Sequence, residues 1–429
     1  IRPTGVGDGT RLRQIVRFIE DSEALKAGVQ GKAERLADAV VPFSFLLAGL
    51  VWLVTRNPAR AASVLLVDYS CALKLSTPLA VLAAMKEGVG RGVLVKGGRF
   101  LESLAAADAV VFDKTGTLTE SRPRVAEVIP GEGYERDDIL RTAACLEEHF
   151  PHPVARAVVR KAEQEGLHHQ EEHTEVEYVV AHGIASRLHG KRVLFGSRHY
   201  IHHDEGVPVD GMREDIERLA REGRSILYLA VDGKLAGLIA IEDPLRPEAA
   251  PVIRKLLGRG IRVVMLTGDD ERTAAAVAER LGISEYRSQV LPTDKAEVIR
   301  SLQAEGHTVA MLGDGINDSP ALSAADVGVT LSDGADLARE VADVVLTECR
   351  LDGLVTAVDL SKAAMRRIRT DFGLIMTLNT VFLASGLAGF LQPGPSALLH
   401  NLTTVGVSLN AMRPMLKAGA EPQLEEVSA

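Results

Sequence analysis

The sequence predicts an α/β chain, in which a parallel sheet carries an inserted α+β domain and two helical hairpins cross a membrane. Apolar strands that end in small or acidic residues alternate with helical stretches, as in VVMLTGDD followed by ERTAAAVAERLG. This order is typical of a parallel sheet. Residues 122–236 interrupt the alternation with strand-like runs on both sides of Asp232-Gly233, which is a hairpin signal. Four apolar segments lie in two pairs outside this central part.

The composition limits the classes of protein to which the chain can belong. Its 429 residues are too many for one core and predict two or three domains. A net charge of −9 does not favour a nucleic-acid partner. Cys71, Cys145 and Cys349 are far apart and form neither a disulfide framework nor a CxxC module. A reducing cytoplasm for the soluble part is the simplest inference.

The apolar segments predict the two membrane hairpins. Residues 39–54 and 61–85 are joined by the break TRNPAR, and residues 372–391 and 396–412 are joined by QPGP. A spanning helix needs about 20 mostly apolar residues, so the second and third segments are long enough and the other two are short. Buried helices of a soluble protein are the alternative, and the two short Pro-containing turns argue against it.

Cations cluster on one side of both hairpins. They are Lys86, Arg91, Lys96, Arg99, Arg366, Arg367, Arg369, Arg413 and Lys417. Positive charges favour the cytoplasmic side of a membrane. The sequence therefore predicts a multi-pass protein of the cytoplasmic membrane, in contact with the lipid bilayer, whose large middle section lies in the cytoplasm.

The run VVFDKTGTLTE contains the first candidate catalytic residue. β-favouring residues end at Asp113 and the chain breaks at Gly116, so we expect a buried strand that delivers one carboxylate to a loop. Open α/β sheets place their ligands at such strand ends. An ordinary strand end followed by a helix cap is the alternative, and the other strand ends decide between the two.

Further strand ends supply the remaining groups of a phosphoryl-transfer site. The first strand end supplies Asp113 and Thr115 as catalytic candidates, and Asp113 can attack phosphorus. Thr267 and Lys295 can hold the phosphoryl oxygens over which charge spreads. Asp314 and Asp318 can join Asp113 around one Mg²⁺, an ion that prefers carboxylates and water. Glycines such as the one in TGDD let the backbone approach a phosphate closely.

The motifs DKTGTLT, TGDD and GDGINDSPAL occur in this order, and with them the chain resembles the heavy-metal P-type ATPases of the haloacid dehalogenase superfamily. The resemblance runs from the first residues to about residue 413. It implies that ATP phosphorylates Asp113 in the presence of Mg²⁺. It also makes His152 an adenine contact, whereas residue type alone would suggest a residue at a helix start. The nucleotide-binding residues that follow from it are Glu147, His152, Pro153, Gly183, Gly196, Gly268 and Asp269.

One position departs from the family pattern. The family's glycine pair reads Ala181-His182-Gly183 here, so its first glycine is missing. A methyl group at that position can crowd the ATP phosphates or shift the affinity for ATP.

The resemblance also implies a division into segments. They are a connector after an actuator domain (1–36), a transmembrane hairpin (37–86), the phosphorylation domain (87–121 and 238–365) around an inserted nucleotide-binding domain (122–237), a second transmembrane hairpin (366–416) and a polar tail (417–429).

Polar residues within the apolar segments are the candidates for binding the transported ion, because such residues are costly in a membrane. Ser70 and Cys71 lie about two turns before Pro78, which breaks the backbone hydrogen-bond ladder because proline has no N–H. The family commonly has Cys-Pro-Cys where this chain has Tyr69-Ser70-Cys71, and a single thiol argues against a two-coordinate Cu(I) site.

The last apolar segment supplies the other candidate ligands, of which His400, Asn401 and Thr404 are preferred over Thr403 and Asn410. Mixed sulfur, nitrogen and oxygen ligands suit a divalent transition-metal cation such as Zn²⁺, Co²⁺ or Ni²⁺, and Mn²⁺ fits if oxygen dominates.

Two further polar residues lie in the apolar segments. Lys74 could repel the ion, lower the pKa of the thiol or act as a counter-ion, but snorkelling or pairing with Asp68 is the simpler account. Asn379 is a weaker candidate ligand, since a hydrogen bond between helices explains it equally well.

Family pumps hydrolyse the aspartyl phosphate with a Thr-Gly-Glu loop, and no TGE occurs in this sequence. We therefore expect a truncated or split pump, with a missing or separate actuator segment as its partner. The main hypothesis is ATP-driven export of a transition-metal cation. The alternatives are a membrane-tethered phosphatase with the same Asp113 chemistry and a regulatory remnant that does not pump.

Overall fold

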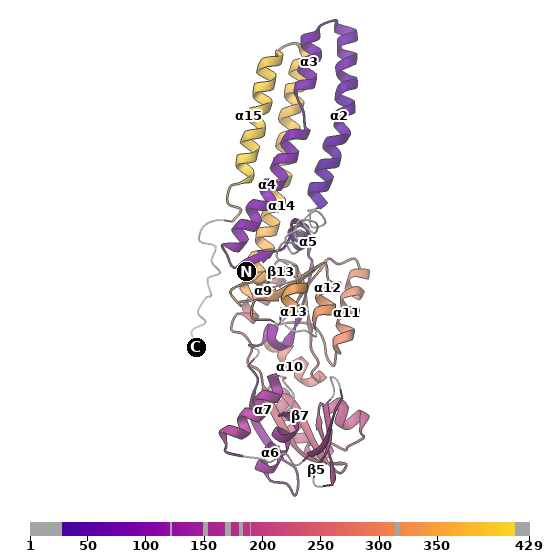
Figure 1. The fold of residues 1–429 in the computed structure, drawn as a ribbon, viewed down its shortest axis with the longest axis vertical. Coiled ribbons are helices and arrows are strands. Elements are labelled where there is room, and N and C mark those ends of the chain that lie inside the picture. The colour runs from indigo at the N-terminus through magenta and orange to yellow at the C-terminus, as the bar shows by residue number, and fades with distance from the viewer. Residues whose placement is uncertain are drawn as a thin grey trace, which may run out of the picture. The chain divides into compact units, whose positions relative to one another are not determined.

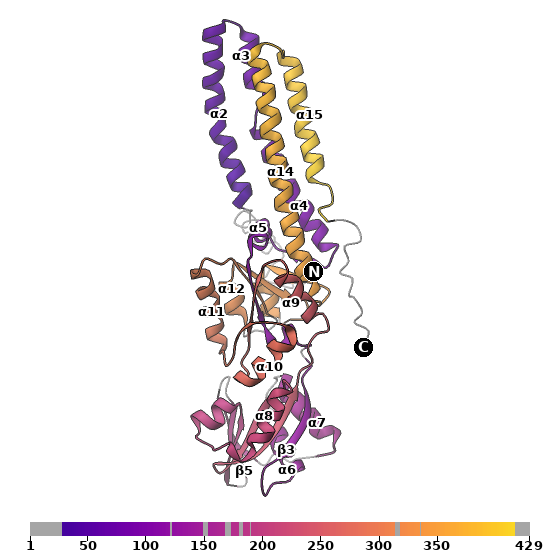
Figure 2. The same ribbon diagram turned by 180° about the vertical axis from the view of Figure 1, so that it is seen from behind.

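The computed structural model describes residues 28–416 except 121, 149–152, 168–172, 180–182, 189, 314–317 and 335 (Figures 1 and 2). The chain forms two compact units. One consists of Asp108–Ala325 and Asp333–Val341, and the other contains the remaining residues. The predicted α/β class of the chain is confirmed.

The unit that contains the chain ends consists mainly of long helices. They are α2 (Gly28–Thr55), α3 (Pro58–Leu66), α4 (Ser70–Val89), α5 (Gly98–Ala106), α14 (Asp352–Ala388) and α15 (Pro393–Ala411). Helix α4 packs against α2, α14 and α15, and Figures 1 and 2 show these helices side by side. The same unit contains three short strands, β1 (Val93–Val95), β12 (Val327–Leu331) and β13 (Val344–Leu346). Strand β13 is parallel to β12 and antiparallel to β1.

Two helical stretches of the described residues are long and apolar enough to cross a bilayer. Pro58–Val89 and Asp352–Ala388 meet this condition, and Val41–Thr55 is a shorter apolar helix. Large apolar side chains on these helices are exposed, for example Phe43, Trp52 and Val381. Exposed apolar surface of this extent is unusual for a protein in water, and lipid would cover it.

The predicted second span is not one continuous helix. Helix α3 ends at Leu66, Val67 is extended, and α4 begins at Ser70, whereas Pro78 lies inside α4. The Asp68 carboxylate accepts hydrogen bonds from the backbone N–H of Ser70 (2.9 Å) and of Cys71 (3.2 Å). Asp68 thus caps two of the donors that a helix start leaves without a partner. The helix is interrupted at this cap, whereas Pro78 removes one backbone donor within α4 and does not end it.

The other unit contains the central parallel strands. In spatial order they are β11 (Val309–Leu312), β2 (Ala109–Asp113), β9 (Arg262–Leu266) and β10 (Glu285–Arg287). Each of the three pairs is parallel. All five residues of β2 are buried, as expected for a strand covered on both faces. The helices of this part are α9 (Ala249–Leu257), α10 (Glu271–Leu281), α11 (Pro292–Ala304), α12 (Ser319–Ala324) and α13 (Asp336–Val341).

An antiparallel sheet forms the inserted part of the same unit. Its order is β3 (Arg124–Pro130), β8 (Lys234–Glu242), β7 (Ser225–Val231), β6 (Lys191–Gly196), β5 (Gly183–Leu188) and β4 (His173–Val179). Helices α6 (Arg136–Glu147) and α7 (Pro153–Gln164) pack on one face, and α8 (Arg213–Arg221) packs on the other. The predicted hairpin turn joins β7 to β8, with Asp232 and Gly233 both at positive φ.

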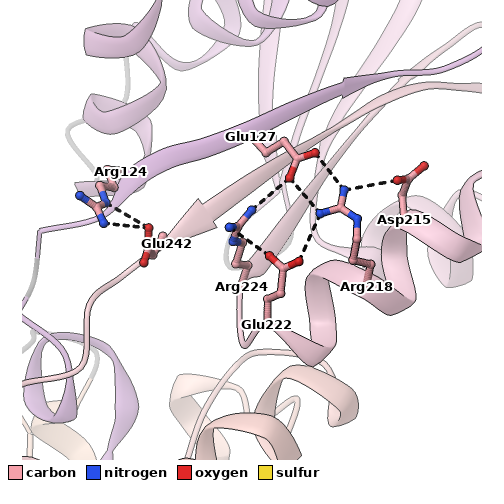
Figure 3. Close-up of polar contacts among 7 residues, drawn as sticks. All are labelled: Arg124, Glu127, Asp215, Arg218, Glu222, Arg224 and Glu242. Atoms are coloured by element: carbon pink, nitrogen blue, oxygen red, sulfur yellow. Dashed lines mark hydrogen bonds and ion pairs between the residues drawn. The ribbon is translucent and has the colours of Figure 1, made fainter. Parts of the chain in front are cut away.

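A network of ion pairs fastens α8 and the turn after it to β3 (Figure 3). Arg218 binds both oxygens of the Glu127 carboxylate, at 2.9 and 3.0 Å, and Arg224 donates to the same carboxylate at 3.1 Å. The hydrogen bonds from Arg218, aided by Arg224, lower the pKa of Glu127. Bidentate contacts of this kind fix the relative orientation of the groups they join. The network therefore holds the backbone that leads into β7.

Candidate active site

Asp113 is the last residue of β2, and its side chain lies at the strand end as predicted. Only 5% of the residue is exposed. The sheet register places Asp113 opposite Leu266 of β9 and Phe112 opposite Leu312 of β11. The residues that follow these two strands, Thr267 and Gly313, therefore lie next to Asp113.

The loop after Asp113 is held by its own hydrogen bonds. Gly116 has φ 77°, a conformation that favours glycine, and its N–H donates to the Thr119 hydroxyl at 2.8 Å. The Arg246 guanidinium donates to the carbonyl oxygens of Thr117 and Thr119 at 3.0 Å and of Gly116 at 3.2 Å. Arg246 comes from residues 242–249, EDPLRPEA, so this segment fixes the shape of the loop that carries the candidate nucleophile.

Lys295 joins two carboxylates at the strand ends. Its ammonium donates to Asp113 Oδ1 at 2.7 Å and to Asp318 Oδ1 at 2.6 Å, and all three residues are almost fully buried. Burial disfavours the charged lysine, but the attraction of the two carboxylates outweighs it and raises the pKa of Lys295 above its usual value. Lys295 is therefore a permanent cation in contact with Asp113.

The residues present fit a divalent cation such as Mg²⁺. Asp113 and Asp318 place buried carboxylate oxygens on either side of Lys295, and carboxylate oxygens are ligands that Mg²⁺ prefers. A Cβ atom at Gly313 would lie 2.8 Å from the Cβ of Asp318, so glycine is needed for Asp318 to approach this closely. The third predicted ligand, Asp314, lies outside the described residues.

The loop after β9 forms a second polar cluster next to the first. The Thr267 hydroxyl donates to Asp269 Oδ2 at 2.9 Å, and Lys114 forms an ion pair with the same carboxylate. Burial opposes ionisation of Asp269, but Lys114 and the hydroxyl donors prevail, so the pKa of Asp269 is lowered. Thr115 and Gly268 are exposed, which leaves both accessible to a ligand.

The predicted nucleotide residues fall into two groups. Glu147 ends α6 and lines a pocket of about 240 Å³ with residues of α7, among them Arg156 and Arg160. Burial raises the pKa of Glu147 to about 7. Gly183 and Gly196 form a second group, since they pair across β5 and β6.

Close packing explains why residue 183 is a glycine. A Cβ at this position would lie 2.5 Å from the Phe195 carbonyl oxygen and 2.6 Å from the Tyr200 ring, so no larger residue fits. Pro153 begins α7. His152, Ala181 and His182 lie outside the described residues.

The predicted ion ligands are divided between two environments. Ser70 and His400 are buried between the helices, as is Asn379. Asn379 donates to the Asp68 carbonyl oxygen at 3.1 Å and lies 3.5 Å from His400 Nδ1. Cys71 and Asn401 instead lie on faces that the described helices leave exposed.

Two other polar residues of these helices do not add to the buried group. Thr404 is partly buried, and its hydroxyl donates to the His400 carbonyl oxygen at 3.1 Å. Lys74 is exposed. In the part of the chain that the structure describes, no three His, Cys, Asp or Glu side chains are grouped to hold a metal ion.

Sequence reasoning missed three residues of this region. Lys114 lies inside the DKTGTLT motif, which could have marked it, and Arg246 lies in residues 242–249, EDPLRPEA. Ser225 opens β7, and its hydroxyl donates to Asp269 Oδ1 at 2.6 Å. No motif in the sequence marked Ser225, because its partner lies 44 residues further along the chain.

Comparison with known proteins agrees with this geometry. Residues 107–326 match the family model of haloacid dehalogenase-like hydrolases. The chain is 41% identical to a zinc-exporting P-type ATPase of Mycobacterium marinum and 40% identical to a manganese-exporting P-type ATPase of Mycobacterium bovis. Each alignment covers 95% of this chain, which spans only 56% and 57% of the two relatives. A crystal structure of a zinc-transporting PIB-type ATPase in the E2.Pi state is similar, with a TM-score of 0.68 and 32% identity over 96% of this chain and 68% of that one.

Proposed function

This chain belongs to the haloacid dehalogenase-like hydrolase family, among the heavy-metal P-type ATPases, and from this premise we propose that it is the catalytic and membrane portion of an ATP-driven exporter of a transition-metal cation. Asp113 accepts the terminal phosphoryl group of ATP. The observation that carries the proposal is the buried contact of Lys295 with both Asp113 and Asp318.

The chemistry follows from the placement of the charges. A carboxylate oxygen of Asp113 attacks the γ-phosphorus, the bond from that phosphorus to the β,γ-bridging oxygen breaks, and ADP leaves. Lys295 orients the Asp113 carboxylate and offers a permanent positive charge to the phosphoryl oxygens. Thr267 follows Leu266, the residue of β9 that pairs with Asp113, and supplies a hydroxyl to the phosphoryl oxygens. Mg²⁺, held by Asp113, Asp318 and Asp314, would neutralise the phosphate charge.

The nucleotide site of this proposal lies in the inserted domain. Glu147, His152 and Pro153 recognise the base, and Gly183 and Gly196 lie beside the phosphates. Gly268 and Asp269 complete the site from the loop after β9. The pocket beside Glu147 supports this placement, and the inserted domain favours ATP over small phosphoesters as the substrate.

The cargo of the proposed exporter is a divalent cation of the Zn²⁺, Co²⁺ or Ni²⁺ type, with Mn²⁺ as the oxygen-rich alternative. Buried Ser70 and His400 support nitrogen and oxygen ligands, to which Cys71 adds sulfur if another segment covers its exposed face. Relatives named as zinc and manganese exporters agree with this range of ions. Asn401 and Thr404 complete the proposed set.

The proposed exporter spans the cytoplasmic membrane several times, with its catalytic domains in the cytoplasm. The long apolar helices and their exposed apolar faces support this location. An actuator segment that hydrolyses the aspartyl phosphate is the remaining partner of the proposal.

Labelling with γ-labelled ATP tests the proposal. We expect acid-stable label on the protein that is lost in Asp113→Asn, and we expect the labelling to depend on one transition metal. Labelling that persists in Asp113→Asn would contradict the proposal. Hydrolysis of small phosphoesters with no labelling by ATP would support the phosphatase alternative instead.

A further inference from the structure

Ser225 connects the inserted sheet to the loop that carries Asp113. Its hydroxyl donates to Asp269 Oδ1 at 2.6 Å and accepts a hydrogen bond from the Lys114 ammonium at 3.3 Å. Lys114 and Asp269 also form an ion pair. Ser225, Lys114 and Asp269 therefore close a triangle, and each comes from a different strand end.

The backbone around Ser225 is fixed from two sides. The Thr273 hydroxyl of α10 donates to the Arg224 carbonyl oxygen at 3.2 Å. On the other side, the Arg224 guanidinium donates to Glu127 of β3 at 3.1 Å, as Figure 3 shows. Residues 224 and 225 thus make consecutive contacts with the segment from Asp269 to Thr273.

The triangle includes the residue that follows the candidate nucleophile. Lys114 is only 4% exposed, so its ammonium depends on protein partners for compensation. Ser225 is one such partner and also one of the hydroxyl donors of Asp269. Loss of this hydroxyl would weaken the restraint on Lys114 and allow the Asp113–Lys114 backbone to shift.

We propose that Ser225 is a positioning residue for phosphoryl transfer, which acts through Lys114 and Asp269 to hold Asp113 in its reactive orientation. The inference rests on the proposed function. It assigns the inserted domain a second role, since β7 then contributes to the geometry of the nucleophile as well as to the nucleotide-binding domain. Ser225 is a positioning residue and not a catalytic one, because its contacts are with Lys114 and Asp269.

The test compares Ser225→Ala and Ser225→Thr with the wild-type protein. Phosphoenzyme formation is measured over a range of ATP concentrations, together with the midpoint of urea unfolding. Ser225→Ala should lower the maximal rate about tenfold, the size expected for one hydrogen bond to a charged group, with little change in KM. Ser225→Thr keeps the hydroxyl and should restore the rate to within about twofold. Ser301→Ala, the same change at an exposed position of α11, is the matched control and should have no effect.

The outcomes distinguish the inference from the function on which it rests. Wild-type protein that is not labelled on Asp113 would overturn the proposed function. Wild-type labelling with an unchanged rate in Ser225→Ala would overturn only the inference. A loss of rate that is matched by a loss of folded protein, or that Ser225→Thr does not restore, would show a structural role and would also overturn the inference.

Discussion

Two regions of the molecule carry candidate sites, the strand ends of the phosphorylation region and the helices with the candidate ion ligands. They differ in how many of the predicted site residues are buried and in contact. At the strand ends, Asp113, Lys295 and Asp318 are buried and in direct contact. Between the helices, His400 is buried but Cys71 is exposed. Parallel strands bring their ends together by register, whereas each helix residue faces its partner only if the rotation of the helix allows it.

The largest effect that would sharpen this comparison is expected at Lys295. Lys295→Met removes the cation that Asp113 and Asp318 share, so we expect phosphoenzyme formation to fall at least about 100-fold. The free energy of unfolding should fall by about 3–5 kcal/mol. Labelling kinetics and urea unfolding measure the two effects.

Lys234→Met is the control for this substitution, because Lys234 is exposed at the start of β8. If Lys295→Met formed phosphoenzyme at the wild-type rate, the contact of Lys295 with Asp113 and Asp318 would not contribute to catalysis.

A smaller effect is expected at the helices, where one buried and one exposed residue adjoin on α15. His400→Ala should reduce the metal-stimulated ATPase rate of the whole pump about tenfold or more, because His400 is buried beside Asn379. Leu399→Ala should change the rate by less than about twofold, since Leu399 is exposed on the described helices and is not a proposed ligand. The two variants are compared over a series of Zn²⁺, Co²⁺ and Mn²⁺ concentrations. Equal losses in both would mean that burial among these helices does not mark the ion ligands.

The smallest effect is expected at Glu147 and depends on pH. The pKa of Glu147 is raised from 4.5 to about 7, so the folded protein binds this proton more tightly than the unfolded chain does. Its contribution to the free energy of unfolding is complete below about pH 4.5 and is lost as the pH rises to about 7.

Glu147→Gln removes this ionisation. The free energy of unfolding of the variant should therefore decline less than that of the wild-type protein between these two pH values, by on the order of 1–2 kcal/mol. Glu148→Gln, at the exposed neighbouring position, serves as the control and should keep the wild-type pH dependence. Identical curves for wild type and Glu147→Gln would show that the Glu147 carboxyl is not buried in solution.

Much of the fold and of the phosphorylation region could be predicted from the sequence, because apolar strands and the residues after them are local patterns. Asp113 at the end of β2 and the Asp232-Gly233 turn are examples. The break between α3 and α4 was not predicted, because Asp68, whose carboxylate caps the start of α4, lies within an otherwise apolar run. Ser225 could not be predicted, because its role depends on a contact between separate strand ends.

The measurement that tests the central claim most directly is the chemical identity of the phosphorylated residue. The protein is incubated with ATP, quenched in acid, reduced with borohydride, digested and analysed by peptide mass spectrometry. Reduction converts an aspartyl phosphate to homoserine, and the account predicts homoserine at position 113 and nowhere else. Homoserine at another aspartate, or unmodified Asp113 in protein that has retained the label, would contradict it.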